Sequence, residues 1–130
     1  MAMIPCRLQF LLYDDQRDHI VFLQEINGQR RLQFVIGAIE ATAIIRHLKG
    51  EHFSRPLTHD LLDGVCTALG GQFFGLRIVR AEQGTYFAEL LIRGEDGTTL
   101  AIDCRPSDGL AVMTRHGANE ILVDESLLAV

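Results

Sequence analysis

The dipeptide Asn27-Gly28 lies between two apolar runs, and this arrangement restricts the fold more than any other feature of the sequence. A type I′ turn needs positive φ at both of its central residues, and asparagine and glycine adopt that conformation most readily. The flanking runs His19–Ile26 and Arg31–Ile36 are therefore predicted to form a β-hairpin. The earlier apolar run Cys6–Tyr13 predicts another strand.

After Gly37 the apolar period changes from that of a strand to that of a helix. The segment Ala38–Lys49 carries apolar residues at i, i+3, i+4 and i+7, which predicts an amphipathic helix. A second helix is predicted over Thr58–Leu69, with Thr58 as its N-cap. A third is predicted near Ser107–His116. The apolar stripe of the second helix consists of Leu61, Leu62, Val65 and Leu69.

The rest of the chain has the pattern of strands. The predicted strands are Gln72–Arg80, Tyr86–Arg93, Thr98–Cys104 and a short Ile121–Val123, followed by a helical turn over Glu125–Leu128. No linker or low-complexity segment divides the 130 residues, of which 48% are apolar. We therefore expect one α+β domain over residues 1–130, with three helices and a mixed, mostly antiparallel sheet of about six or seven strands.

The charge of the chain limits its partners. The formal net charge is −5, and Lys49 is the one lysine among 12 basic residues. This composition lacks the basic face that holds nucleic acid non-specifically, so RNA or DNA would be held weakly, through a few arginines. It also lacks a polybasic segment for anionic lipid, and its apolar runs are far shorter than the ~20 residues of a membrane span. We expect no membrane association.

Cysteine usage and the N-terminus point to one compartment. The three cysteines, Cys6, Cys66 and Cys104, form no CxxC pair, which is typical of free thiols and not of a disulfide framework or a zinc site. The N-terminus has no basic region followed by a long apolar segment, so it does not have the pattern of a secretion signal. The predicted location is the cytoplasm.

Two helix starts share one local pattern. The segments Arg55–Asp60 and Arg105–Asp108 both run from Arg-Pro through a hydroxyl residue to a carboxylate. Proline presets the first helical turn, and the acid complements the positive end of the helix dipole, so helix initiation alone explains such a pattern. A helix N-terminus with an arginine just before it is also a natural phosphate site. Both interpretations stay open here.

The residues at these helix starts are of the types that phosphodiester cleavage needs. Arg55 and Arg105 could neutralise a phosphate, and His59 could transfer protons as general acid or base. Ser107 is a further catalytic candidate, although serine at this position is more often a helix cap. The carboxylates that could hold Mg²⁺ or Mn²⁺ are Asp60, Asp103 and Asp108.

Each of these residues also has a purely structural interpretation. Asp60 and Asp108 could only cap their helices, and Asp103 could only pair with Arg105 or Arg55. Two other titratable residues, Glu40 and His47, share a helix face opposite the apolar stripe and are expected on a solvated surface.

The two segments together resemble the bifunctional nuclease domain family, also called the DNase-RNase domain. The resemblance covers roughly residues 20–128 and implies a compact α+β fold with divalent-metal-assisted cleavage of RNA and DNA. Gly109 departs from the family's usual alanine, which should weaken the first turn of the third helix by up to ~1 kcal/mol. The resemblance is carried by Arg55–Leu62, Ile102–Asp108, Val35–Gly37, Glu40-Ala41 and Tyr86–Leu90. The family motif positions fall on Arg55, Thr58, His59, Asp60, Asp103, Arg105, Ser107 and Asp108.

Two hypotheses of function follow. In the first, the chain is a metal-assisted nuclease that cleaves RNA and DNA. In the second, it is a non-catalytic regulatory module that binds an anion or a partner's carboxylates with the same arginines and helix N-termini. A homodimer is also expected, because a small domain rich in strands leaves sheet edges to cover.

Overall fold

The computed structural model describes residues 2–13, 19–51, 54–116 and 120–130. They form one mixed, mostly antiparallel sheet with three α-helices, which confirms the predicted α+β class. In chain order the elements are β1 (Met3–Tyr13), β2 (His19–Glu25), β3 (Arg31–Ile36), α1 (Ala38–Leu48), α2 (Thr58–Ala68), β4 (Gln72–Glu82), β5 (Thr85–Arg93), β6 (Thr99–Cys104), α3 (Pro106–Arg115), β7 (Ile121–Asp124) and the 3₁₀ turn η1 (Glu125–Leu127).

The short strand β7 joins two antiparallel halves of the sheet. The strand order is β3-β2-β1-β7-β4-β5-β6. β7 runs antiparallel to β1 and parallel to β4, so Ile121 pairs with Cys6 on one side and with Leu76 on the other. The predicted hairpin is confirmed as β2–β3. Its turn is not the predicted type I′, because neither Asn27 nor Gly28 has positive φ and a longer loop follows the pair of Gln24 with Arg31. At the far edge of the sheet, no described strand pairs with the outer side of β6.

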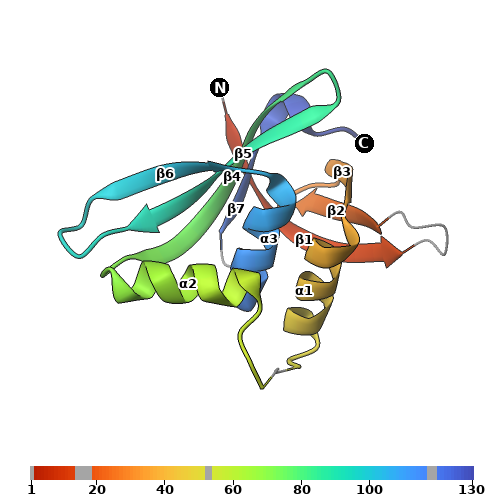
Figure 1. The fold of residues 1–130 in the computed structure, drawn as a ribbon. Helices are drawn as coiled ribbons and strands as arrows, with labels where there is room; N and C mark the ends of the chain where they lie inside the picture. Colours follow the sequence, from red (N-terminus) through yellow and green to blue (C-terminus); the bar gives the residue numbers. More distant parts are fainter. Residues whose placement is uncertain (1, 14–18, 52–53, 117–119) are drawn as a thin grey trace.

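The three helices lie on one face of the sheet, with α3 between α1 and α2 (Figure 1). Helix α3 is the most deeply placed, since all its residues except Asp108 and Arg115 are buried. Its apolar side chains pack on fully buried residues of the sheet, including Leu76 and Ile78. The core therefore lies between this helix layer and the sheet, and the start of α3 lies at the edge of that core.

Helix α2 buries the opposite face from the one that its sequence pattern suggests. Its apolar stripe is exposed, whereas the two residues that it buries are His59 and Asp63. These two polar side chains face α3 because they pair with charged groups there. The predicted N-cap is also wrong by one residue, because Leu57 is the cap and the Asp60 carboxylate accepts a hydrogen bond from the Leu57 amide at 2.9 Å.

The cysteines are free thiols, as predicted. Burial raises the pKa of both Cys6 and Cys104 to about 11, so these two stay protonated and unreactive near neutral pH. Among the described residues, no helix has the length and apolar character needed to cross a membrane.

Gly109 lies where α3 comes closest to the sheet. A Cβ built on Gly109 would lie 2.4 Å from Cδ1 of Leu76, a side chain that is fully buried. The glycine that departs from the family's usual alanine thus allows close contact between helix and strand, besides weakening the helix turn.

Replacing Gly109 with alanine is expected to destabilise the protein. Overpacking a core costs about 1–3 kcal/mol, whereas alanine returns at most about 1 kcal/mol of helix propensity. We expect the free energy of unfolding, measured by urea denaturation, to fall by about 1–2 kcal/mol. Gly64→Ala in α2 is the matched control, because a Cβ there meets nothing within 4 Å and should stabilise the helix. Stabilisation by both substitutions would contradict the close packing at Gly109.

Candidate functional site

The starts of α2 and α3 meet through a histidine and a carboxylate. His59 is the second residue of α2, and its Nε2 lies 3.0 Å from Oδ1 of Asp108 in the first turn of α3. Only 9% of the His59 side chain is exposed. The two segments that share the Arg-Pro pattern are therefore brought together in space, although 49 residues separate the paired side chains.

Arg105 fixes this carboxylate from the other side. Its Nε donates to Oδ2 of Asp108 at 2.8 Å, and its Nη2 donates to Oδ1 at 3.1 Å. Nη2 also donates to Glu40 of α1 at 2.6 Å. Burial raises the pKa of the Asp108 carboxyl, but the hydrogen bonds from Arg105 and His59 outweigh it and hold that pKa below its usual value. We call Glu40, His59, Arg105 and Asp108 the Arg105 cluster.

The hydrogen bonds of the Arg105 cluster determine which ring nitrogen of His59 remains available to a substrate. Asp108 is ionised near neutral pH and can only accept, so Nε2 of His59 must donate to it. The described residues give Nδ1 of His59 no hydrogen-bond partner. In the neutral ring Nδ1 then carries the lone pair, and the adjacent carboxylate would stabilise the ring if it took up a proton.

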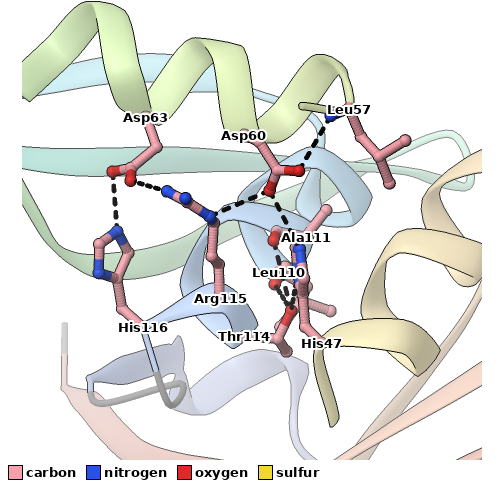
Figure 2. A network of polar contacts seen from close by, with 9 residues as sticks. All are labelled: His47, Leu57, Asp60, Asp63, Leu110, Ala111, Thr114, Arg115 and His116. Carbon is pink, nitrogen blue, oxygen red and sulfur yellow. Dashed lines mark hydrogen bonds and ion pairs between the residues drawn. The ribbon is translucent and has the colours of Figure 1, made fainter. Parts of the chain in front are cut away.

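A second polar network joins α2 to the end of α3 and to α1 (Figure 2). Oδ1 of Asp60 forms an ion pair with Nε of Arg115 at 3.0 Å and lies 3.3 Å from Nε2 of His47. Arg115 also pairs with Asp63, whose other oxygen is 2.8 Å from Nε2 of His116. We call His47, Asp60, Asp63, Thr114, Arg115 and His116 the Asp60 cluster.

His47 is held at both of its nitrogens. The Thr114 hydroxyl donates to the Leu110 carbonyl at 2.8 Å, so its oxygen is left to accept from Nδ1 of His47 at 3.3 Å. The other nitrogen faces Asp60. Burial raises the pKa of the Asp60 carboxyl, but the Leu57 amide, His47 and Arg115 outweigh it and keep that pKa below its usual value. The two contacts hold the His47 ring between Thr114 of α3 and Asp60 of α2.

An open pocket of about 610 Å³ adjoins the Asp60 cluster. Its walls include His47, Asp60, Arg115 and His116, together with Arg55 from the segment before α2. The Arg55 side chain is exposed, and the described residues give it no hydrogen bond or ion pair. The pocket therefore offers one uncommitted guanidinium, Arg55, to an anionic ligand. Its other cationic groups, and the carboxylate of Glu51 in its wall, are already in ion pairs.

Comparison with known proteins identifies the family. The model of the bifunctional nuclease domain matches residues 21–130, nearly the whole chain. The chain belongs to the bifunctional nuclease domain family. Two uncharacterized proteins of Mycobacterium tuberculosis, from the strains CDC 1551 / Oshkosh and H37Rv, are each 38% identical to it over 114 residues. That match covers 88% of this chain and 66% of each relative, so the chain spans just under two thirds of their length. Membership suggests a nuclease-like function.

Two other predicted site residues of this bifunctional nuclease domain lie apart from these contacts. Ile102 pairs with Leu90 on the helix-covered face, so the next residue, Asp103, points to the opposite face and is exposed. Ser107 is buried at the second position of α3, and Arg105, not Ser107, is the N-cap residue.

The predicted metal ligands do not form one site as they are arranged. Asp60 and Asp108 are each already paired with an arginine and a histidine, and Asp103 lies on the other face of the sheet. Within the described ranges there is no group of three or more histidine, cysteine or acidic side chains placed to hold a metal ion. The role of the three carboxylates as metal ligands stays a prediction, and we assign no chemical step to a cation.

Several residues of these clusters were not predicted. Glu40 and His47 were expected on a solvated surface, and this interpretation is wrong, because Glu40 is buried against Arg105 and His47 is held by Asp60 and Thr114. The face of α1 that they share packs on α3, and the sequence alone did not indicate this packing. The other unpredicted members are Asp63, Thr114, Arg115 and His116.

Proposed function

We propose that this bifunctional nuclease domain cleaves phosphodiester bonds in RNA and DNA, with His59 as its general acid and base. The observation that carries the proposal is the 3.0 Å contact between Nε2 of His59 and Asp108, which leaves Nδ1 without a partner among the described residues. A histidine oriented by a carboxylate through one nitrogen is the usual arrangement for proton transfer at the other. Family membership supports the same reaction class.

The residues of the Arg105 cluster have different roles in such a reaction. Nδ1 of His59 takes the proton from the attacking water or hydroxyl, and Asp108 stabilises the imidazolium that forms. Nη1 of Arg105 makes none of the three bonds to Asp108 and Glu40, and 68% of the side chain is exposed, so this nitrogen can donate to a phosphoryl oxygen. The same His59 then returns the proton to the leaving oxygen.

Arg55 supplies a second contact to the substrate. It lines the pocket beside the Asp60 cluster, while Arg105 pairs with Asp108 in the first turn of α3 and does not line that pocket. A nucleic-acid strand carries a phosphate on every nucleotide, so one strand can contact both arginines through different phosphates. With so few cations and a net charge of −5, the strand is held weakly and the salt dependence of binding is shallow.

Cleavage assays on the wild-type protein test this proposal. We expect hydrolysis of both RNA and single-stranded DNA, loss of activity in a chelator, and recovery on addition of Mg²⁺ or Mn²⁺, as the family resemblance implies. Activity that survives the chelator would overturn the predicted need for a cation but not the acid–base role of His59. The nuclease proposal is overturned if neither RNA nor single-stranded DNA is cleaved by the protein alone, in the chelator, or after Mg²⁺ or Mn²⁺ is added.

A second candidate function is a non-catalytic anion-binding module. The observation that favours it is that Glu40, Asp60, Asp63 and Asp108 are all paired with arginine or histidine, while Arg55 is unpaired among the described residues. Such a module would bind a short oligonucleotide or inorganic phosphate without breaking it. Binding that depends on Arg55, with no cleavage in the assays above, would select this function over the first.

We also propose that the protein works in the cytoplasm, because its three cysteines are all free. Free thiols persist in reducing compartments and oxidise in extracellular ones. Fractionation of cells that express the natural protein tests this location.

A further inference from the structure

Glu40 is a buried carboxylate on α1 that has no role of its own in the reaction described above. It is the third residue of the helix and is 8% exposed. Its Oε1 accepts from Nη2 of Arg105 at 2.6 Å, although 65 residues separate the two in the sequence. The described residues give its side chain no other hydrogen bond or ion pair. A carboxylate that is removed from water needs such a partner, so Glu40 depends on Arg105.

The stability of the fold does not require a carboxylate at this position. Most of the Arg105 side chain is exposed, so water could solvate Nη2 if Glu40 were absent. A buried ion pair is often no more stabilising than apolar side chains of the same volume. The residues of α1 that are buried beside Glu40 are the apolar Ala41, Ala43 and Ile44. The effect of Glu40 on the guanidinium itself gives a better reason for its presence.

The hydrogen bonds of Arg105 leave donors on one nitrogen alone. A guanidinium has five N–H groups, one on Nε and two on each terminal nitrogen. Nε donates to Oδ2 of Asp108, and Nη2 donates both to Oδ1 of Asp108 and to Glu40. The N–H groups that remain therefore both belong to Nη1. Without Glu40, Nη2 would also offer a hydrogen, and the fork of Nη1 and Nη2 could bind two oxygens of one phosphate.

We propose that Glu40 is a positioning residue, which closes the Nη1–Nη2 fork of Arg105 and restricts the substrate phosphate to Nη1. In the proposed function, on which this role rests, Arg105 holds the phosphoryl group while His59 moves the proton. The carboxylate acts in two ways, because it occupies the second hydrogen of Nη2 and its negative charge repels a phosphate from that side of the guanidinium. The phosphate then has one position relative to His59, since Asp108 contacts both His59 and Arg105.

Cleavage kinetics of the variant Glu40→Met test this role. Methionine fills a similar volume but offers Nη2 only a weak acceptor. We expect kcat to fall by about 10–100-fold, because a displacement of about 1 Å is enough to slow a reaction to this extent. We expect KM to fall as well, since the phosphate can then bind the whole fork, tightly but in a geometry less suited to reaction. A purely structural loss would reduce the amount of folded protein and would not lower KM.

Two further substitutions make this test specific. Glu40→Gln keeps an oxygen that accepts from Nη2, so it should retain most of kcat. Glu82→Met is the matched control, because Glu82 pairs with Arg80 where both side chains are exposed, outside the Arg105 cluster, and it should cleave at the wild-type rate.

The outcomes separate this role from the proposed function. If the wild type cleaves neither RNA nor DNA, the proposed function is wrong and the role of Glu40 falls with it. If the wild type cleaves, the role alone is wrong in any of three cases. These are an equal kcat for Glu40→Met and Glu82→Met, a rise of KM in Glu40→Met, or a loss in Glu40→Gln as large as that in Glu40→Met.

The variant Gly37→Ala moves the Glu40 carboxylate without removing it. Gly37 is the N-cap residue of α1, and its extended backbone is one that alanine also adopts. A Cβ on Gly37 would lie 2.6 Å from Oε2 of Glu40, so the end of this flexible side chain must shift. We expect Gly37→Ala to unfold at the wild-type temperature and to lower kcat, by less than Glu40→Met does. Gly64→Ala, whose added Cβ meets nothing within 4 Å, is its control, and an equal kcat for these two variants would contradict the positioning role.

Discussion

The substitution His59→Gln is expected to lower the rate of phosphodiester cleavage by about 10²–10⁴-fold, the usual contribution of a general acid–base residue. Glutamine can still donate a hydrogen bond from its amide to Asp108, so the join between α2 and α3 is kept. It cannot take up or release a proton. The comparison therefore separates the chemical role of His59 from its place in the packing, when cleavage is measured alongside thermal unfolding.

Two further variants complete this test. Thr67→Ala, at an exposed position on the same helix, is the matched control and should cleave at the wild-type rate. Asp108→Asn removes the charge that orients His59, so it should also lower the rate of cleavage. If His59→Gln cleaves as fast as Thr67→Ala, His59 has only a structural role and the proposed acid–base assignment is wrong.

The substitution Arg115→Ala is expected to give the largest loss of stability, about 2–4 kcal/mol in the free energy of unfolding. Arg115 pairs with both Asp60 and Asp63, and Asp63 is buried. Removing the guanidinium leaves two carboxylates close together with only histidines to balance them. Because 39% of the Arg115 side chain is exposed, water offsets part of this cost, and the value stays below that of a fully buried pair.

Chemical denaturation measures this loss, with Arg46→Ala as the control. Arg46 pairs with Glu51 where both side chains are exposed, and exposed ion pairs contribute up to about 1 kcal/mol. The substitution Asp63→Asn in the Arg115→Ala background should recover part of the stability, because it removes a buried carboxylate that has lost its arginine partner. Equal losses from Arg115→Ala and Arg46→Ala would show that the Asp60 cluster does not stabilise the packing of α2 on α3.

The order and type of the elements could be predicted because each carries a strong local signal. The two apolar runs around Asn27-Gly28 indicate the β2–β3 hairpin, although not the type of its turn. The change of apolar period after Gly37 marks α1. All three helices and seven strands lie within a few residues of their predicted limits. The family match and the observed sheet confirm the resemblance and the α+β class. Both could be predicted because they depend on local sequence patterns.

The orientation of the helices could not be predicted in the same way. An amphipathic pattern shows that two faces differ, but not which face meets the rest of the protein. In α2 the polar face is inside, because His59 and Asp63 find charged partners on α3, and the apolar face is left exposed. Glu40 and His47 were misplaced for the same reason. Their partners, Arg105 and Asp60, lie on other helices.

The face to which the Asp103 side chain points could have been predicted from the sequence. Side chains alternate along a strand, so Asp103 must point away from the face that holds Ile102 and Cys104. The apolar character of Ile102 indicates which face is covered. By contrast, the contact between His59 and Asp108 depends on how α2 and α3 pack, and a shared Arg-Pro pattern does not specify that packing.

The central place of β7 has a consequence for how the protein is made. β1 and β4 lie on either side of it, so the two halves of the sheet have no strand between them until Ile121–Asp124 has left the ribosome. The pairing of Met3 with Asp124 closes a loop that spans almost the whole chain, and such distant contacts form slowly. Until then the nascent chain exposes two unpaired inner edges, and this interval is when it is most open to aggregation or to chaperone binding.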